Sequence, residues 1–256
     1  MEILPLRTPT LKRDDDLAKI LAHAGSFMDG DIVVVSSKAV ATVEGAEIDL
    51  RALKPSPEAE KWAARCGRPP AFREAILRET ERLHGTVLGS CTQAMLTELK
   101  PKGFGEGTIL AANAGLDQSN VPEGFAIGWP HDPVASVRHL RGELVRLTGR
   151  RLALILSDSC CRPRRLGVTA LALVVSGIDP IRSLVGSRDL FARELTMTSE
   201  AVADQLATAA NFVMGNAAEA TPAALIRNHG LSLTDFEGWV QGIERERDLF
   251  AGALSP

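Results

Sequence analysis

The chain has 256 residues, of which 45% are hydrophobic and 24% charged, and this supplies a sizeable core for one large domain or two small interlocked ones. The formal net charge of −3 and the isoelectric point near 6.0 argue against a nucleic-acid surface spread over the whole molecule. The sequence shows neither an apolar run of the roughly 18 residues that a membrane span needs nor a secretory signal, so we expect a cytoplasmic protein with small-molecule partners.

The N-terminal part predicts an edge strand, a helix and a buried strand. Two prolines interrupt residues 2–11, which favours an edge strand that runs into a loop. Residues 14–24 begin with three aspartates and carry one apolar face, which predicts a helix ending at Gly25. The apolar run at residues 32–35 is typical of a buried strand, and Ser36, Ser37 and Lys38 follow it. Lys38 is a candidate phosphate contact, with a merely solvated lysine as the alternative.

The next part predicts helical and hairpin segments. One helix begins at Ser56-Pro57, and another segment begins at Pro69-Pro70. Residues 68–83 are so rich in charge that we expect them to lie outside the core. The glycine-rich residues 103–107 predict a hairpin turn before a strand at residues 108–112. A polar loop, residues 113–120, comes next.

The central stretch, residues 151–167, predicts a binding site. A helix that begins at Asp132-Pro133 and stops at Gly149 precedes it. The apolar run 152–156 predicts a strand buried on both faces, which ends in a polar turn beginning Ser157-Asp158-Ser159. Carboxylate and hydroxyl oxygens suit Mg²⁺ or Mn²⁺, and the nearby Arg162, Arg164 and Arg165 can pair with phosphate or carboxylate oxygens. A solvated basic turn is the alternative.

The C-terminal part predicts two more strands and two helices. The strands are residues 168–175 and 223–226, and an amphipathic helix at 199–214, closed by Gly215, lies between them. The final 20 residues are dense in charge and predict a solvated helix whose ion pairs each contribute little.

Polar side chains follow three of the predicted strands, and this recurrence points to one shared site. Ligands in open α/β sheets bind beyond the carboxyl ends of strands. We therefore expect Asp117 and Asp158 to lie close enough to share a divalent ion. Two such carboxylates repel one another without a cation between them, so we expect a raised pKa on one of them in the metal-free protein.

Three segments taken together resemble the coenzyme F420-0:γ-glutamyl ligase family. They are NAGLDQSNV at 113–121, SDSCCRPRRLG at 157–167 and the run from Gly186 to Gly215. The resemblance covers about residues 3–231. It implies a single ligase-like domain over 1–256 with a mixed α/β (α+β) fold. In this fold, mixed sheets with flanking helices form an interwoven, two-lobed subunit. The resemblance also implies a homodimer. The implied activity is the GTP- and metal-dependent joining of L-glutamate to F420-0 by an amide bond, through an acyl phosphate.

The resemblance also implies roles for individual residues. Asp117, Asp158 and Ser159 would bind Mg²⁺ or Mn²⁺, and Asn120 would contact the substrate. Arg162 and Arg165, with the two aspartates, are the candidate catalytic residues. The nucleotide would lie against three groups of residues: Thr8, Pro9, Thr10 and Leu11; Ser37, Lys38 and Thr42; and Gly215, Asn216, Ala217, Ala218 and Glu219.

The sequence departs from the family pattern in places that bear on the nucleotide. Thr42 stands where a lysine is usual, which removes a cation near the triphosphate. Residues 216–220 hold less glycine than is usual, and a Cβ limits how closely backbone N–H groups approach phosphate. Two alternatives therefore remain open: a ligase that uses another anionic acceptor or another nucleotide, and a catalytically silent protein that binds a nucleotide or cofactor.

Overall fold

The computed structural model of the chain describes residues 1–254 and is built on a six-stranded sheet. The strand order is β1 (Glu2–Leu6), β12 (Ala223–Arg227), β2 (Ile32–Ser36), β8 (Ala153–Cys161), β9 (Val168–Ser176) and β13 (Glu237–Trp239). β2 and β8 run parallel, and the other neighbours are antiparallel. The expectation of a mixed α/β fold with mixed sheets is confirmed.

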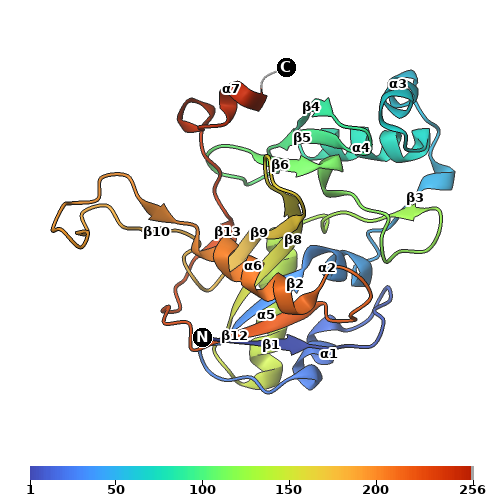
Figure 1. The fold of residues 1–256 in the computed structure, drawn as a ribbon. Coiled ribbons are helices and arrows are strands. Elements are labelled where there is room, and N and C mark those ends of the chain that lie inside the picture. The colour runs from blue at the N-terminus through green and yellow to red at the C-terminus, as the bar shows by residue number, and fades with distance from the viewer. Residues whose placement is uncertain (255–256) are drawn as a thin grey trace.

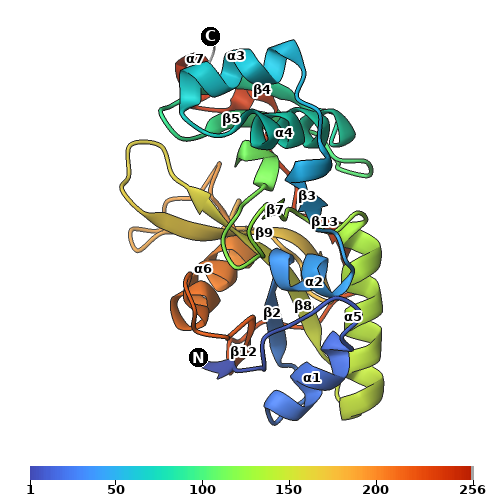
Figure 2. The same ribbon diagram turned by 90° about the vertical axis from the view of Figure 1, so that its right-hand side faces the viewer.

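Helices cover both faces of this sheet, because both faces of its central strands are apolar. In β8, Leu154 and Leu156 pack into one core cluster, and Ala153 and Ile155 into the other. Helix α6 (Val202–Met214) covers one face, and α1 (Leu17–Ala24) and α5 (Pro133–Thr148) cover the other (Figure 2). Burying apolar surface in this way contributes roughly 25 cal/mol per Å².

A second unit packs a small sheet against two helices (Figure 1). Its antiparallel strands are β4 (Thr86–Ser90), β5 (Met95–Leu99) and β6 (Ile109–Ala112), and the turn predicted at residues 103–107 lies in the β5–β6 connection. The helices are α3 (Pro57–Cys66) and α4 (Pro70–Arg82). The prediction that residues 68–83 lie outside the core is wrong. Phe72 and Ile76 are buried, the buried Glu79 pairs with Arg82 at 2.6 Å, and the buried Arg73 donates to the Cys66 carbonyl at 2.8 Å, so both charged side chains have a hydrogen-bond partner.

Short elements complete the chain. They are α2 (Ser37–Val43), β3 (Ile48–Asp49), η1 (Leu50–Ala52), η2 (Asn113–Gly115), β7 (Phe125–Ala126), β10 (Arg182–Ser183), β11 (Ser199–Glu200), η3 (Arg245–Arg247) and α7 (Ala251–Leu254). The predicted helix 199–214 begins later, at Val202, because residues 199–200 pair with β10. Within residues 1–254, no helix is long and apolar enough to cross a membrane.

The C-terminal segment is not the predicted charged helix. It contains β13, which pairs with β9, and then η3 and α7, and residues 255–256 of the prediction lie outside the described residues. Trp239 is buried, and Gly242 donates a hydrogen bond from its N–H to the carbonyl of Glu106 at 3.1 Å. The start of this segment therefore packs onto the protein, whereas most residues after Gly242 are exposed.

Strand β8 also runs further than predicted. Ser157, Asp158 and Ser159 belong to the strand and pair with β9 as far as Cys161 opposite Val168. The register shifts opposite Leu156 and Ser157, where β9 contributes one extra residue. Polar residues of this kind resemble a turn in the sequence, but the partner strand holds them extended.

Candidate functional site

A cleft of about 530 Å³ lies where β2 and β8 bring their polar ends together. Ser36 of β2 pairs with Ser157 of β8, so Lys38, two residues on, and Asp158, one residue on, become neighbours. The other walls come from distant parts of the chain. They are Thr8, Pro9, Thr10 and Leu11; Thr42; Asp117, Ser119 and Asn120; and Gly215, Asn216, Ala217, Ala218 and Glu219.

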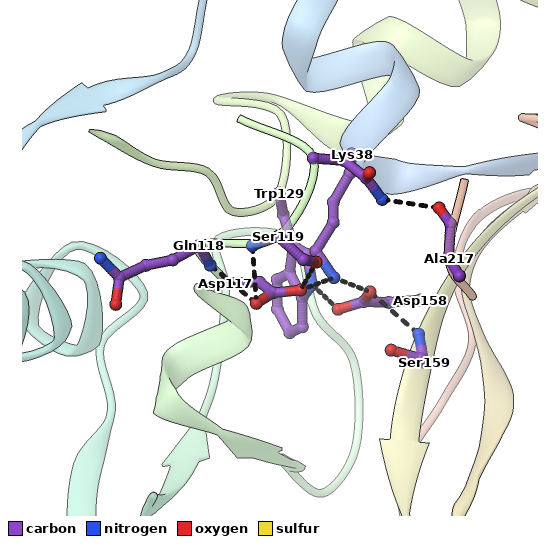
Figure 3. Close-up of polar contacts among 9 residues, drawn as sticks. Lys38, Asp117, Gln118, Ser119, Trp129, Asp158, Ser159 and Ala217 are labelled. Atoms are coloured by element: carbon purple, nitrogen blue, oxygen red, sulfur yellow. Dashed lines mark hydrogen bonds and ion pairs between the residues drawn. The ribbon is translucent and has the colours of Figure 1, made fainter. Parts of the chain in front are cut away.

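The cleft holds two carboxylates with one ammonium group between them (Figure 3). Lys38 Nζ lies 3.3 Å from Asp158 Oδ1 and 3.5 Å from Asp117 Oδ2. The close approach predicted for the two aspartates is therefore found, although they are far apart in the sequence. Asp158 is buried, whereas the Asp117 side chain is 42% exposed and faces solvent more openly.

The loop around Asp117 fixes this carboxylate with local hydrogen bonds. Its backbone exchanges two hydrogen bonds with Ile127, each 2.9 Å long. Oδ1 accepts the N–H groups of Gln118 at 2.7 Å and Ser119 at 3.1 Å, and Oδ2 accepts the Ser119 hydroxyl. A carboxylate held by this many donors favours its ionised form.

The electrostatics around Asp117 differ from the expectation of a raised carboxyl pKa. Burial raises the pKa of Asp117, but the Ser119 hydroxyl, the Lys38 ammonium and the backbone donors outweigh it, so the pKa of Asp117 is lowered. Burial lowers the pKa of Lys38, and the charges of Asp158 and Asp117 outweigh this, so the pKa of Lys38 is raised. The expectation of a raised pKa therefore does not hold for Asp117, because the Ser119 hydroxyl and the Lys38 ammonium favour its ionised form.

The loop after α6 closes the cleft and is tied to both neighbouring walls. The Ala217 carbonyl accepts a hydrogen bond from Asn120 Nδ2 at 3.0 Å, and the Ala220 carbonyl accepts one from the Thr8 N–H at 2.9 Å. Within the loop, the Glu219 carboxylate accepts the Ala217 N–H at 2.8 Å. An acidic side chain therefore occupies a backbone donor of a loop that lines the cleft.

Residues 5–228 match the family described as F420-0:gamma-glutamyl ligase. The chain belongs to this family. A coenzyme F420:L-glutamate ligase of Methanopyrus kandleri is 38% identical over 238 residues, which are 93% of this chain and 90% of the relative. Those of Methanothermobacter thermautotrophicus and Archaeoglobus fulgidus are 38% and 35% identical, and the matches cover 94% and 97% of this chain and 94% of each relative.

Membership in the F420-0:gamma-glutamyl ligase family confirms the resemblance that the three motifs suggested, and it confirms the expectation of a ligase. Two of those motifs form the centre of the cleft, since Asp117 lies in the first and Asp158 in the second. The third motif supplies α6 and the glycine at which the closing loop begins, Gly215.

The donors in the cleft fit a divalent cation of the hard type. Within residues 1–254, no three His, Cys, Asp or Glu side chains gather as a metal site. Two carboxylates do converge, with the Ser159 and Ser119 hydroxyls in the same cleft. Mg²⁺ is commonly held by one or two carboxylates together with substrate phosphates, and this donor set suits that arrangement in a ligase of this family. Lys38 Nζ takes the position of a cation between the carboxylates.

Four of the residues that were predicted at the site lie away from the cleft lining. Ser37 is fully buried, because α2 begins there and directs its side chain inward, and Ser36 lines the cleft in its place. The three arginines Arg162, Arg164 and Arg165 lie in the β8–β9 connection and are exposed. Arg162 Nε lies 3.3 Å from the Thr169 hydroxyl. A family ligand that reaches these arginines has to extend beyond the cleft.

Trp129 is the site residue that the sequence analysis missed. Its indole N–H donates to Asp158 Oδ2 at 2.7 Å, and the residue is 3% exposed. No spacing in the sequence links it to Asp158, because the contact depends on how the loop after β7 crosses β8. In this ligase the tryptophan belongs to the core cluster that also contains Leu154 and Leu156.

Proposed function

We propose that this chain forms an amide bond between L-glutamate and the carboxylate of F420-0, with GTP as co-substrate and Mg²⁺ or Mn²⁺ as the metal. The observation that carries the proposal is the convergence of Asp117, Asp158 and Lys38 in a cleft whose walls include the loops at 8–11 and 215–222. The names of the relatives, coenzyme F420:L-glutamate ligases, support the choice of acceptor and amino acid.

The reaction needs two transfers. A carboxylate oxygen of the acceptor attacks the γ-phosphorus of GTP, the bond to the bridging oxygen breaks, and GDP leaves. The neutral amine of glutamate then attacks the acyl carbon of the acyl phosphate, phosphate leaves with the bonding electrons, and the nitrogen loses a proton as the amide forms. Both steps bring anions together, so the site has to supply positive charge and fixed orientation.

The residues of the chain divide this work. Asp117, Asp158 and Ser159 would hold the divalent cation, which supplies charge neutralisation for phosphate oxygens when bound. Lys38 offers a second positive charge at the same end of the cleft. The segments 8–11 and 215–219, with Thr42, would hold the nucleotide, and Asn120, which already bonds to the Ala217 carbonyl, would join that wall to the substrate.

Turnover by purified protein tests this proposal. F420-0, L-glutamate, GTP and Mn²⁺ are expected to yield GDP and an acceptor heavier by one glutamate residue, both measured by mass spectrometry. Asp158→Asn should reduce the rate by orders of magnitude. Its stability should fall by roughly 1–3 kcal/mol, because an amide turns one of the two accepting oxygens into a donor. If the folded fraction of Asp158→Asn fell as far as its rate, Asp158 would be a structural residue instead.

One observation favours a second candidate, a ligase that uses another nucleotide or acceptor. The Glu219 carboxylate lies on the Ala217 N–H, and Thr42 supplies no charge. Both features weaken a triphosphate site. Replacing GTP by ATP, and F420-0 by simpler anionic acceptors, separates this candidate from the first. A protein that binds nucleotide in calorimetry and turns over none of these mixtures would be a silent binding protein.

We also propose that the functional form is a homodimer. The arm between β10 and β11 extends away from the main sheet (Figure 1), and its Leu190, Phe191 and Met197 are 101%, 82% and 87% exposed. Exposed apolar side chains gathered on one arm are typical of an interaction surface. Sedimentation equilibrium should give twice the chain mass, and Phe191→Ser should shift the equilibrium toward monomer. A monomeric wild-type protein would refute the proposal.

A further inference from the structure

The Asp158 carboxylate is held on both of its oxygens by donors of different kinds. Oδ1 accepts the Ser159 N–H at 2.9 Å and faces Lys38 Nζ. Oδ2 accepts the Trp129 indole N–H at 2.7 Å inside the core. A carboxylate with both oxygens engaged has one orientation, so the geometry of Oδ1 in the cleft depends on what holds Oδ2.

The indole is suited to this because it is a donor without charge. A cation on Oδ2 would cancel the negative charge that a metal ion needs, whereas a neutral N–H satisfies the buried oxygen and leaves the charge in place. The buried oxygen would otherwise lack a partner, and an unpaired buried acceptor destabilises the fold.

The surroundings fix the indole. Its ring centroid lies 6.2 Å from that of Trp239, which in turn lies 5.9 Å from that of Phe104. On another side the backbone of Gly115 leaves room for it, since a Cβ at that position would lie 2.7 Å from Trp129 Nε1. The NAG part of the first motif therefore contributes to the position of the tryptophan.

The same loops carry Asp117 and Trp129. The backbone hydrogen bonds between Asp117 and Ile127 join the two segments, and Trp129 follows two residues later. The pair of loops thus positions one carboxylate directly and the other through the indole. The spacing between Asp117 and Asp158 is set by this connection together with the ion pairs to Lys38.

We propose that Trp129 is a positioning residue for divalent-cation binding: its indole N–H orients the Asp158 carboxylate so that Oδ1 points to Lys38 and Asp117. This inference rests on the proposed metal site at Asp117 and Asp158. Partners that orient a metal-binding carboxylate typically change metal affinity or activity by about 10–100-fold when removed. The effect is therefore measurable on Mn²⁺ alone, without nucleotide or turnover.

The experiment compares Mn²⁺ binding by wild type, Trp129→Phe and Trp239→Phe, followed by calorimetry and by the electron paramagnetic resonance signal of free Mn²⁺. Trp239→Phe is the matched control, because it removes a buried indole of the same aromatic cluster whose N–H lies 3.3 Å from the Lys102 carbonyl, away from Asp158. Trp129→Phe should raise the dissociation constant about 10–100-fold and abolish the change in tryptophan emission on adding Mn²⁺. Trp239→Phe should retain both within about threefold.

Each other outcome has a defined meaning. Wild-type protein that binds no Mn²⁺ removes the proposed metal site, and this inference with it. Wild type and Trp129→Phe binding equally well overturn the inference and leave the metal site standing. Equal weakening in both variants shows a packing effect and also overturns it. If Trp129→Phe does not fold, benzothienylalanine at position 129 replaces the N–H by sulfur, retains the two-ring shape and is expected to weaken Mn²⁺ binding as strongly.

Discussion

Removing the charge of Lys38 is the most direct test of the carboxylate pair. Lys38→Met retains an apolar stem of similar length and leaves Asp117 and Asp158 facing each other without a cation. At an effective dielectric constant of about 20, Coulomb's law gives roughly 5 kcal/mol for each of the two ion pairs. Desolvation of the ammonium and solvent screening of the exposed Asp117 reduce this to a net loss of about 1–3 kcal/mol. For a chain of this length the melting temperature should fall by about 3–10 °C.

Mn²⁺ should reverse this loss. A cation at a hundred times its dissociation constant stabilises the folded state by about 2.7 kcal/mol. In the wild type, Mn²⁺ must also displace the lysine from the carboxylates, which reduces the net stabilisation. The metal-induced rise in melting temperature should therefore be larger in Lys38→Met. Differential scanning calorimetry in metal-free buffer, with and without MnCl₂, measures both effects.

The control for this experiment is Lys61→Met, which removes an exposed lysine on α3. It should leave the melting temperature and the response to Mn²⁺ as in the wild type. The reasoning is refuted if Lys38→Met melts like wild type in metal-free buffer, or if Mn²⁺ raises its melting temperature no more than that of the wild type.

Three further predictions concern the same cleft. Thr42→Lys should tighten GTP binding about ten- to a hundredfold in calorimetry, because Lys38 is engaged by the carboxylates and leaves room for a second cation. Unchanged affinity would place Thr42 away from the phosphates. Glu219→Gln keeps an acceptor for the Ala217 N–H and removes a negative charge, so GTP should bind about tenfold more tightly. Guanosine, which carries no phosphate, should bind as before. An equal gain in affinity for GTP and guanosine would contradict the charge argument. The pKa of Lys38 is raised in the folded protein, so its charge stabilises the fold at every pH below its unfolded pKa near 10.4. The pKa of Asp117 is lowered, so its charge stabilises the fold at every pH above its unfolded pKa near 3.9. The stability difference between wild type and Lys38→Met should therefore be greatest near neutral pH and shrink as the pH falls toward the lowered pKa of Asp117, because protonation of a carboxylate relieves the repulsion in the variant and then removes the ion pair in the wild type. A difference that grows in acid would refute this assignment.

The sequence predicted the parts of the fold that hydrophobic patterning controls. Buried strands such as residues 32–35 and 152–156, and the amphipathic helices α5 and α6, stand out because an apolar run or a regular apolar face has few alternatives. Prediction failed where contacts with another segment or side chain determine the extent of a strand or the burial of a charge. The polar residues after Leu156 stay in β8 because β9 pairs with them. The charges of α4 are buried because they find partners, Glu74 and Glu79 on arginines of the same helix and Arg73 on the Cys66 carbonyl of α3.

The site shows the same division. Motif resemblance placed Asp117, Asp158 and Lys38 in one site, and the register of β2 against β8 explains why they meet. Trp129 could not be found from the sequence, because its role comes from the way one loop crosses a strand. Ser37, which was expected to contact the nucleotide, is buried at the start of α2, and Ser36 lines the cleft beside it, because at a helix start a single position decides which side chain faces the cleft.

The strand order sets the time at which the cleft can form during synthesis. β12 lies between β1 and β2, and Glu2 pairs with Arg227. The first strand therefore has no partner in the sheet until nearly the whole chain has been made, which is roughly 10–45 s later at about 5–20 residues per second. The parallel pair β2 and β8, which brings Lys38 to Asp158, is available earlier. A nascent chain can thus assemble its carboxylate pair before the wall formed by residues 8–11 and 215–222 exists, and the cleft is complete only when β12 enters the sheet.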